Sequence, residues 1–402
     1  MMNLRICHMI PGFFPIAKGG AEMFALNLCK ALQRHGHVVQ ILTRNLDLPY
    51  NDSYEGVQIH RFKNILPYQI KILGFGQFLK SKYLRILVAF FDVIGGILSL
   101  WKLQRKNQFH LMHASFIVPW GLIGLIVKKL IKIPLIITVH GPADFYEVPP
   151  VLSPVLRFIL SRCDKAVTVS PKLRKDIIEK MGYLPLEVIC NGIPQGSGAS
   201  PGNLAILGKY RINTETFVIL TAGRLVQRKN IDLLIRTLPK ILEKIPEAKV
   251  VVLGSGIEAQ ELRKVVKELQ LGASVIMPGW VSEAEKNALF NRANIFIQLS
   301  QREGLSLALL ESKAAGVPAI IIGTNNSLEP VNHGITGLLL EPPVTSEKIL
   351  EQTVFLYSNQ ELRQKMGENA KKEAELKYSL EKMVDNYIKV YFRALRKNRG
   401  YI

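Results

Sequence analysis

The stretch FVILTAGRLVQRKNIDLLIRTLPKILEKIPEAKVVVL, residues 217–253, decides the fold. Its two ends, 217–221 and 249–253, are short apolar runs typical of buried strands, whereas 231–238 carries apolar residues at the spacing of one helix face. A strand, a helix and a second strand in this order predict two parallel strands joined by a covering helix. The stretch therefore indicates a parallel α/β domain.

The same alternation continues in both directions along the chain. Further strand-like runs lie at 274–277, 295–299, 318–322 and 337–340 on one side, and at 5–10, 38–43, 58–62, 109–113, 135–139, 166–169 and 186–189 on the other. The Gly-, Pro- and Ser-rich segment NGIPQGSGASPGN (191–203) separates the two series. We expect two Rossmann-like, doubly wound domains, 1–195 and 205–375, followed by a closing helix over 376–402 that packs back toward the N-terminal domain.

Length and composition agree with this division. A chain of 402 residues suffices for two domains, and 48% hydrophobic with 21% charged residues is typical of a globular protein and excludes disorder, collagen and coiled coil. The four cysteines lie far apart without a CxxC pair, so neither a disulfide framework nor a zinc site is predicted. The first fourteen residues break at Pro11 and are too short an apolar run for a secretory signal. A reducing compartment, the cytoplasm, fits best.

Charge is the unusual feature of the composition. The 52 Lys and Arg against 32 Asp and Glu leave a net charge of +20, and between Arg61 and Lys132 the only acidic residue is Asp92. Such an excess indicates a polyanionic partner, with acidic lipid and nucleic acid both open, although a solvated basic face would give the same count.

The run ILVAFFDVIGGILSLW (86–101) is the most apolar segment of this basic region. As a helix its 16 residues span about 24 Å, less than the roughly 30 Å of a hydrocarbon core. A helix buried against the sheet is the favoured interpretation, and an interfacial membrane segment is the second. Basic residues flank the run on both sides: Lys80, Lys82, Arg85, Lys102, Arg105 and Lys106. Peripheral docking to the inner face of the cell membrane is the resulting hypothesis.

Several strand ends carry residues suited to an anionic ligand. Gly19 and Gly20 follow the first strand and open the helix 21–34, which lets backbone approach a ligand and points free N–H groups toward it. This is not a GxGxxG pattern, so a nicotinamide cofactor has little support, and an ordinary strand-to-helix turn is the alternative. In the second half, Arg224 ends the strand 217–221 and Lys229 stands at the entrance of the next helix. Two cations therefore lie where open α/β sheets bind ligands.

The segment EGLSLALLE (303–311) follows the strand 295–299 at the same expected edge. If its helix begins near Ser306, backbone N–H groups form an anion pocket, with Glu303 in the loop before it and Glu311 farther along the helix. The N–H groups concerned belong to Leu305, Ser306 and Leu307. A lone carboxylate in a loop is usually only solvated, but here cations, carboxylates and a helix start converge.

His140 ends the strand 135–139 in the first half. It could position an acceptor or a reacting oxygen, or it could be a hydrogen-bonded structural histidine. No DxD motif occurs in the chain, so we expect no metal, and charge neutralisation would come from Arg224, Lys229 and helix N-termini.

Together these motifs resemble a known family, the retaining nucleotide-sugar glycosyltransferases of the GT-B fold, family 4-like and group 1. The resemblance rests on eight segments spread over most of the chain: FFPIAKGGAEMFALNLCKALQRHGHVVQILT, LIITVHGPADF, VSPKLRKDI, VICNGIP, GRLVQRKNIDLLI, EGLSLALLE, GVPAIII and HGITGLLLEP. The combination is far more specific than any single segment. It implies two domains facing across a cleft that holds the donor.

The resemblance also implies roles for individual residues. Arg224 and Lys229 would hold the diphosphate, assisted by the amides after Gly304 and by Gly19 and Gly20. Glu311 would bind the ribose, Glu303 would meet the transferred sugar, and His140 would sit by the anomeric centre and acceptor. Trp280 and Val281 would line the nucleobase. No cofactor is implied beyond the nucleotide sugar, which is a substrate.

Three departures from the family pattern bear on donor identity. Asn230 stands where a glycine commonly follows the lysine, Leu305–Ser306 where Phe-Gly is usual, and 325–327 (NNS) where paired glycines are expected. The expected function is transfer of a hexose from a UDP- or GDP-sugar, with retention and without metal, to a glycan or lipid-linked acceptor in cell-surface polysaccharide or glycolipid synthesis. A sugar-nucleotide 2-epimerase of the same fold and a non-enzymatic basic protein that binds RNA or membrane are the alternatives, with nucleic acid the less favoured partner.

Overall fold

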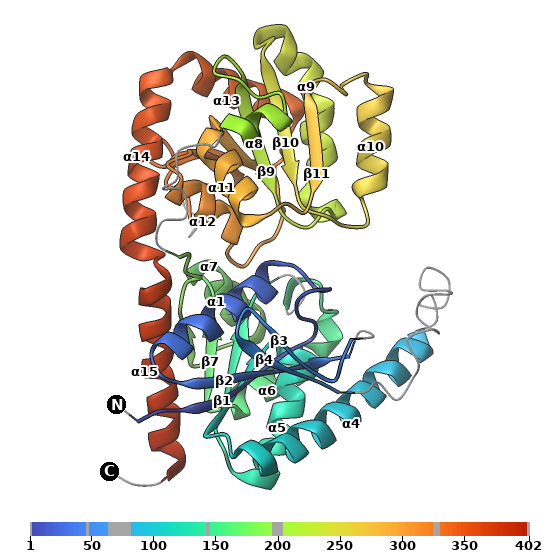
Figure 1. Cartoon of the computed structure of the whole chain (residues 1–402), viewed down its shortest axis with the longest axis vertical. Helices are drawn as coiled ribbons and strands as arrows, with labels where there is room; N and C mark the ends of the chain where they lie inside the picture. Colours follow the sequence, from blue (N-terminus) through green and yellow to red (C-terminus); the bar gives the residue numbers. More distant parts are fainter. Residues whose placement is uncertain are drawn as a thin grey trace. The chain divides into compact units, whose positions relative to one another are not determined.

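The computed structural model describes residues 2–45, 48–62, 82–141, 145–194, 204–324 and 330–399. The chain forms two compact units, here called unit 1 (Met1–Asn191 with Leu380–Ile402) and unit 2 (Gly192–Ser379) (Figure 1). The chain thus leaves unit 1 and later returns to it. Ile193 and Ser379, beside the two crossing points, pair in an isolated bridge.

Unit 1 is built on an eight-stranded sheet in the order β3-β4-β2-β1-β5-β6-β7-β8. The strands are β1 (Arg5–Ile10), β2 (Val38–Arg44), β3 (Asn51–Tyr54), β4 (Val57–Phe62), β5 (Leu111–Ser115), β6 (Leu135–Val139), β7 (Lys165–Thr168) and β8 (Leu186–Val188). All neighbours pair in parallel except β3 and β4, which form a hairpin through Glu55 and Gly56, both with positive φ. The strand β3 is missing from the sequence expectation because NDSY is polar and lies at the exposed sheet edge.

Helices cover both faces of this sheet. They are α1 (Gly20–Arg34), α4 (Lys82–Asn107), α5 (Leu122–Ile131), α6 (Ser153–Arg162), α7 (Pro171–Met181) and α15 (Leu380–Arg399). The apolar sides of α1 and α15 share one core cluster with Ile6, Ile41 and Ile136 of the strands. On the other face, α5 lies so close to the sheet that a Cβ at Gly124 would approach Leu135 Cδ1 to 2.6 Å.

Unit 2 has a six-stranded, wholly parallel sheet in the order β11-β10-β9-β12-β13-β14. The strands are β9 (Phe217–Ala222), β10 (Ala248–Leu253), β11 (Val275–Gly279), β12 (Ile295–Gln298), β13 (Ala319–Ile322) and β14 (Gly337–Leu340). The helices are α8 (Leu204–Lys209), α9 (Ile231–Lys244), α10 (Ala259–Glu268), α11 (Glu283–Arg292), α12 (Leu307–Ala314), α13 (Ser346–Ser358) and α14 (Gln360–Lys377). Because α9 and α13 pack in one core cluster and the side chains of α11 and α12 in another, the sheet is covered on both faces.

Both sheets are doubly wound, as the sequence predicts. In each, the chain runs outward from a central strand, then crosses back and runs outward on the other side, so that β1 and β5, and likewise β9 and β12, flank a topological switch point. The apolar segment 86–101 lies within α4, in keeping with a helix. Among the residues that the structure describes, no helix combines the length and apolar character needed to cross a membrane.

Candidate functional site

The switch point of unit 2 lies between β9 and β12, and the loops leaving these strands carry Arg224, Lys229 and Glu303. Hydrogen bonds join the two loops: the Asn230 side-chain amide donates to Leu299 O at 3.0 Å, and the Gln301 N–H donates to Arg228 O at 3.2 Å. The loops therefore form one connected edge. Open α/β sheets bind ligands at this position.

Lys229 and Glu303 form an ion pair across this edge. Their side chains are only 11% and 23% exposed, so the pair is partly withdrawn from water. Lys229 also lies over the backbone of Gly223, whose missing Cβ would stand 3.5 Å from Nζ. The structure thus brings together the cation and the carboxylate that the sequence placed at a common edge.

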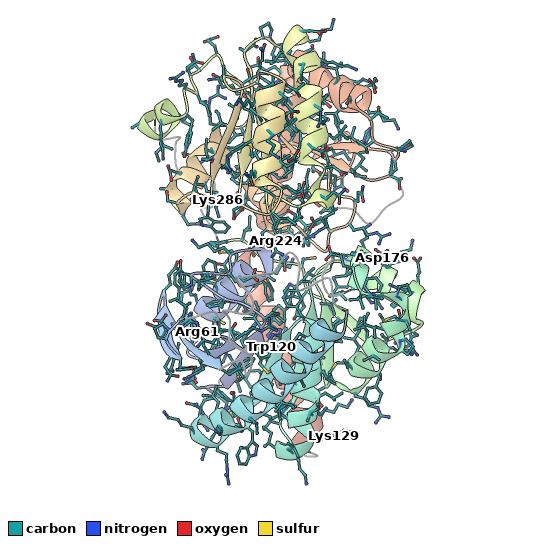
Figure 2. The ribbon with its side chains drawn as sticks, turned by 90° about the vertical axis from the view of Figure 1, so that its right-hand side faces the viewer. Arg61, Trp120, Lys129, Asp176, Arg224 and Lys286 are labelled. Carbon is teal, nitrogen blue, oxygen red and sulfur yellow. The ribbon has the colours of Figure 1, made fainter. Side chains whose placement is uncertain are left out.

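Asn230 explains one departure from the family pattern. It ends the turn Gln227–Lys229 with a φ of 49°, in the left-handed region, and then begins α9. Asparagine enters this region more readily than other residues with a side chain, so it preserves the backbone path that a glycine would take. Arg224 is exposed on the loop after β9 (Figure 2).

Two glycines that the sequence analysis did not single out complete the edge. A Cβ on Gly254 would meet Gly223 O at 2.0 Å, and one on Gly256 would meet Leu225 O at 2.1 Å. Only glycine permits this close approach of the loop after β10 to the loop after β9. The Leu225 N–H also donates to Ser255 O at 2.9 Å. The GSG sequence that follows the strand 249–253 could have indicated this close approach of two loops.

The helix α12 begins where the sequence predicts. Ser306 caps it, its hydroxyl accepting from the Leu309 N–H at 3.4 Å, and Leu307 is the first helical residue. Gly304 and Leu305 are buried just before the cap. The first turn of α12 directly follows the loop that carries Glu303. Because its N–H groups lack partners within the helix, such a helix start favours the binding of an anion.

Glu311 lies on α12 facing α11, where Lys286 binds it at 2.6 Å (Lys286 is labelled in Figure 2). Lys286 also pairs with Glu283 at 2.9 Å. Burial raises the pKa of Glu311 and Lys286 opposes this rise, while the two carboxylates raise the pKa of Lys286 against the effect of its own burial. Lys286 was not predicted from the sequence, because only the packing of α11 on α12 brings it to Glu311.

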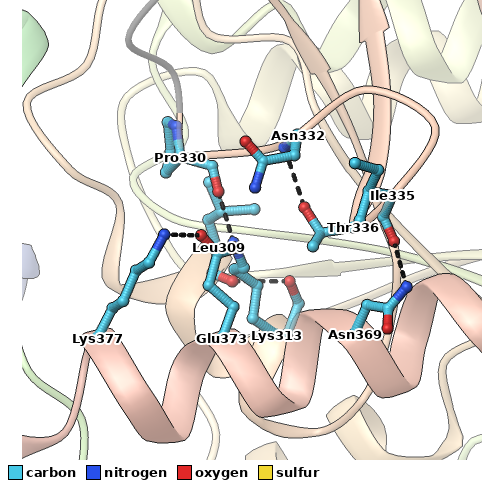
Figure 3. A network of polar contacts seen from close by, with 10 residues as sticks. Leu309, Lys313, Pro330, Asn332, Ile335, Thr336, Asn369, Glu373 and Lys377 are labelled. Atoms are coloured by element: carbon cyan, nitrogen blue, oxygen red, sulfur yellow. Dashed lines mark hydrogen bonds and ion pairs between the residues drawn. The ribbon is translucent and has the colours of Figure 1, made fainter.

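A buried lysine fixes α12 from its other end. Lys313 is fully buried, and its ammonium donates to Pro330 O at 2.5 Å and to Glu373 of α14 at 2.6 Å (Figure 3). Lys377 binds the second oxygen of Glu373 at 3.0 Å. Burial lowers the pKa of Lys313, and Glu373 counteracts that effect. The helix carrying the candidate motif is therefore anchored by a buried ion pair.

Trp280 and Val281 follow β11 at the same edge of the sheet, two strands away from β9. The Trp280 side chain is 44% exposed and Val281 is half-buried. The Gly279 carbonyl before them accepts a hydrogen bond from the Gly254 N–H at 2.9 Å. This bond connects the loop after β11 to the loop after β10. An exposed indole beside cationic loops is suited to stacking on a planar ring.

In unit 1, Gly19 and Gly20 stand where β1 leads into α1. Gly19 is extended and precedes the helix, and Gly20 is its first residue. A Cβ built on Gly20 would meet nothing within 4 Å, so the helix start faces open space. The position therefore suits an anion approaching the backbone.

His140 follows β6 in unit 1 and belongs to a histidine cluster. The Ser115 hydroxyl lies 3.1 Å from His140 Nε2 and 3.0 Å from His8 Nε2. A hydroxyl donates only one hydrogen bond, so at least one of these two imidazoles donates to Ser115 Oγ. Burial, reinforced by His8, lowers the pKa of His140 to about 3. His140 is thus a hydrogen-bonded, neutral histidine at a strand end, and its part in acceptor binding stays a prediction.

The cluster continues to the C-terminal helix. His113 lies between Tyr391 Oη at 2.8 Å and Thr138 Oγ1 at 2.7 Å, and Thr138 Oγ1 is 2.9 Å from Tyr387 Oη. All four side chains are fully buried. Burial lowers the pKa of His113 and raises the pKa of both tyrosines, so the network is neutral. The contact of His113 with Tyr391 of α15 was not predicted from the sequence.

Two stretches of the predicted site lie outside the described residues: 142–144 after His140, and 325–327 with its departure from the family glycines. Among the described residues, no three His, Cys, Asp or Glu side chains gather in a way that would hold a metal ion.

Comparison with known proteins gives two family matches. The model for glycosyl transferases group 1 matches residues 203–373, and the model for glycosyltransferase family 4 matches residues 18–195. The chain is 22% identical over 386 residues to N-acetyl-alpha-D-glucosaminyl L-malate synthase of Bacillus anthracis, with 95% of this chain and 96% of that one covered. It is 25% identical over 376 residues to alpha-monoglucosyldiacylglycerol synthase of Streptococcus pneumoniae, with coverage of 87% and 81%.

A solved structure agrees on the fold. Sucrose-phosphate synthase from Thermosynechococcus elongatus superposes with a TM-score of 0.80 at 17% identity, covering 98% of this chain and all of that one.

Proposed function

The chain belongs to the glycosyltransferases of group 1 and family 4 with the GT-B fold, and from that premise we propose that it transfers a hexose, with retention, from a UDP- or GDP-sugar to a glycan or lipid-linked acceptor. The products are the nucleoside diphosphate and the extended acceptor. The bond from the sugar C1 to the diphosphate oxygen breaks, and a bond from C1 to the acceptor oxygen forms. The acceptor proton goes to the departing diphosphate, in a front-face transfer assisted by the leaving group.

The observation that carries the proposal is the Lys229–Glu303 pair at the switch point of unit 2. In the proposal, Lys229 and Arg224 bind the diphosphate and stabilise the negative charge that grows as it departs, together with the N–H groups at the start of α12. Cations and dipoles fixed in advance stabilise such charge most effectively where water is reduced. Glu303, already held beside Lys229, accepts hydrogen bonds from hydroxyls of the transferred sugar. It has no nucleophilic role in this scheme.

We assign the rest of the donor to neighbouring residues at the same edge. Glu311 accepts from the ribose hydroxyls, and Lys286 keeps its carboxylate oriented. Trp280 and Val281 contact the nucleobase. The roles of Glu311, Trp280 and Val281 follow the resemblance residue by residue; Glu311 lies on α12, and Trp280 and Val281 follow β11. The role of Lys286, on α11, rests on its ion pair with Glu311.

In the proposal, unit 1 supplies Gly19, Gly20 and His140. His140 is neutral above about pH 3 because burial lowers its pKa, so it acts as a hydrogen-bonding group and not as a permanent cation. The relative alpha-monoglucosyldiacylglycerol synthase is named for a glycolipid product, which supports a lipid-linked acceptor here. Such an acceptor would bring the protein to a membrane surface.

The test is release of nucleoside diphosphate from UDP- and GDP-sugars in the presence and absence of an acceptor extract. We expect release with one donor that rises when acceptor is added, and a product glycan that keeps the anomeric configuration of the donor. Activity should survive EDTA, because Lys229, Arg224 and helix N–H groups replace a metal. Interconversion of two sugar nucleotides without acceptor would show an epimerase instead, and loss of activity in EDTA would overturn the metal-free scheme.

A further inference from the structure

The helices α4, α5 and α6 of unit 1 form a continuous layer on one side of the sheet (Figure 1). At Gly96 of α4, a Cβ would approach Ile123 Cδ1 of α5 to 2.7 Å, so the Ile123 side chain packs directly on the backbone of α4. At the other side of α5, Lys128 Nζ binds Asp164 at 2.7 Å and donates to Arg162 O at 3.2 Å at the end of α6. The outward sides of the three helices are therefore neighbouring surfaces.

Large apolar side chains are exposed along this layer. On α6 and the turn before it, Val151 is 80%, Val155 45% and Phe158 47% exposed. Their spacing of four and then three residues puts them on one side of the helix, continued by Arg162 four residues later. Leu130 at the end of α5 is 64% exposed, and Leu98 on α4 is 51% exposed. Single exposed apolar residues are ordinary, but a row of them along neighbouring helices marks an interaction surface.

The charge of the same layer is one-sided. The sequences of α4, α5 and α6 contain nine basic residues and a single acidic one, Asp92. Among the residues whose side chains the structure describes, those that are exposed include Lys102, Arg105, Lys106, Lys129, Arg157 and Arg162 (Lys129 is labelled in Figure 2).

Two of these cations lie against exposed or partly exposed aromatic rings. The Arg162 guanidinium stands 5.4 Å from the centre of the Phe158 ring, and that of Arg105 stands 4.5 Å from the Trp101 ring. An apolar row bordered by cations whose stems lie along it is the pattern of an interfacial membrane surface. The apolar groups enter the boundary of the acyl chains while the cations stay at the anionic headgroups.

We propose that the outer surface of α4, α5 and α6 docks on an anionic lipid bilayer, with Val151, Val155 and Phe158 of α6 inserting at the interface and Lys129 and Arg162 contacting headgroups. The lipid follows from charge complementarity and from the exposed apolar row, which a polyanion such as RNA would leave in water. The inference deepens the proposed function, on which it rests for the location of the acceptor. The membrane-docking surface proposed here includes α6 and the end of α5, whereas the sequence pointed to the segment 86–101 and its flanking basic residues.

The test is co-sedimentation of the full chain with vesicles of phosphatidylglycerol and phosphatidylcholine, compared with vesicles of phosphatidylcholine alone. We expect binding to the anionic vesicles that weakens as salt is added, because headgroup attraction is screened. The double variant V155S/F158S should bind about tenfold more weakly, since it removes two inserting apolar groups. K129E/R162E should bind at least about tenfold more weakly at low salt.

Matched controls come from unit 2. Phe355 on α13 is 41% exposed, close to the exposure of Phe158, and Lys264 on α10 is exposed. F355S and K264E should bind vesicles like the wild-type protein, and the melting temperature of each variant confirms folding. Vesicle binding that V155S/F158S leaves unchanged, or equal binding to both kinds of vesicle, would overturn the proposal.

Two further outcomes identify another occupant and would also overturn it. A lipid-free dimer that V155S/F158S converts to monomer would assign the surface to a second copy of the chain. Tight binding of RNA that K129E/R162E abolishes and V155S/F158S does not, without vesicle binding, would assign it to nucleic acid. Because the vesicle assay contains no sugar donor, its failure is separable from failure of the proposed function, which shows as lack of nucleoside diphosphate release.

Discussion

The two units differ in the buried polar groups that hold their C-terminal helices. Unit 1 connects α15 to its sheet through neutral groups, Tyr391 to His113 and Tyr387 to Thr138. Unit 2 connects α14 to α12 through a buried ion pair, Lys313 with Glu373, and sets a second pair at its switch point. A buried charge is tolerated only when paired, whereas a buried imidazole remains neutral at the cost of a lowered pKa. The difference predicts that acid acts mainly on the stability of unit 1. The second pair of unit 2 belongs to the edge to which we propose that the diphosphate binds.

The largest expected effect concerns the buried pair of unit 2. Lys313→Met should lower the free energy of unfolding by about 3 kcal/mol, because Glu373 loses its buried partner. Urea unfolding followed by circular dichroism measures it. The double variant K313M/E373M, which removes both charges, should regain most of the loss, while Lys377→Ala, whose side chain is 62% exposed, should cost less than about 1 kcal/mol. If Lys313→Met alone were as stable as the wild-type protein, the Lys313–Glu373 pair would contribute nothing to the free energy of unfolding.

The next effect separates binding from chemistry at the switch point. Glu303→Ala should lower turnover by about tenfold or more, which corresponds to about 1.4 kcal/mol in the barrier, because the sugar loses its hydrogen-bond acceptor. Affinity for the nucleoside diphosphate should not fall, since Lys229 stays in place. Steady-state kinetics and nucleotide titration measure the two quantities, and Glu268→Ala on the exposed side of α10 is the control. Full activity in a folded Glu303→Ala protein would remove the carboxylate from the site.

The third effect tests the neutral interior of unit 1. Burial lowers the pKa of His8 from 6.5 to about 3, so below pH 6.5 the unfolded chain binds more protons than the folded one. Stability is therefore fully present above pH 6.5 and declines as pH falls toward 3, by up to about 1.4 kcal/mol per pH unit for each such histidine. His8→Gln should make this decline less steep when unfolding is measured at about pH 7.5 and about pH 5. A slope in His8→Gln identical to that of the wild-type protein would place the acid sensitivity elsewhere.

The smallest effect concerns the anchoring of α15. Tyr391→Phe removes the hydroxyl that lies 2.8 Å from His113 Nδ1 and should lower the free energy of unfolding by about 1 kcal/mol. Because the phenyl ring keeps its packing, the loss reports the hydrogen bond alone. Tyr183→Phe, at an exposed tyrosine of the same unit, is the matched control. A loss no larger than that of the control would show that neutral hydrogen bonds do not hold the helix.

The sequence predicts the fold well because an apolar run marks every strand of both sheets except β3. The strand β3 was not predicted, because an edge strand needs no alternation of apolar residues: NDSY is exposed and pairs with β4 on one side only. The helix start at Ser306 was predictable because a serine cap directly precedes the helix.

The candidate site was predictable only where the motif itself carries the chemistry. Arg224, Lys229 and Glu303 follow strand ends, so topology alone collects them at one edge. Lys286 and Tyr391 were not found, because each reaches its partner through packing of helices distant in sequence. The close contact of Gly254 with Gly223 likewise depends on two loops meeting in space.

The most direct test of the charged edge of unit 2 is calorimetric titration of the wild-type protein and Lys229→Ala with UDP and GDP, with Lys240→Ala as control because its ammonium pairs with Glu347 on the exposed surface. Loss of a charge-assisted contact to phosphate costs about 1.5–3 kcal/mol, which is about tenfold or more in affinity. We predict that the wild type and Lys240→Ala bind one of the two nucleotides equally well and that Lys229→Ala binds it at least about tenfold more weakly. Equal affinity of the wild type and Lys229→Ala would contradict the assignment of the diphosphate to this edge.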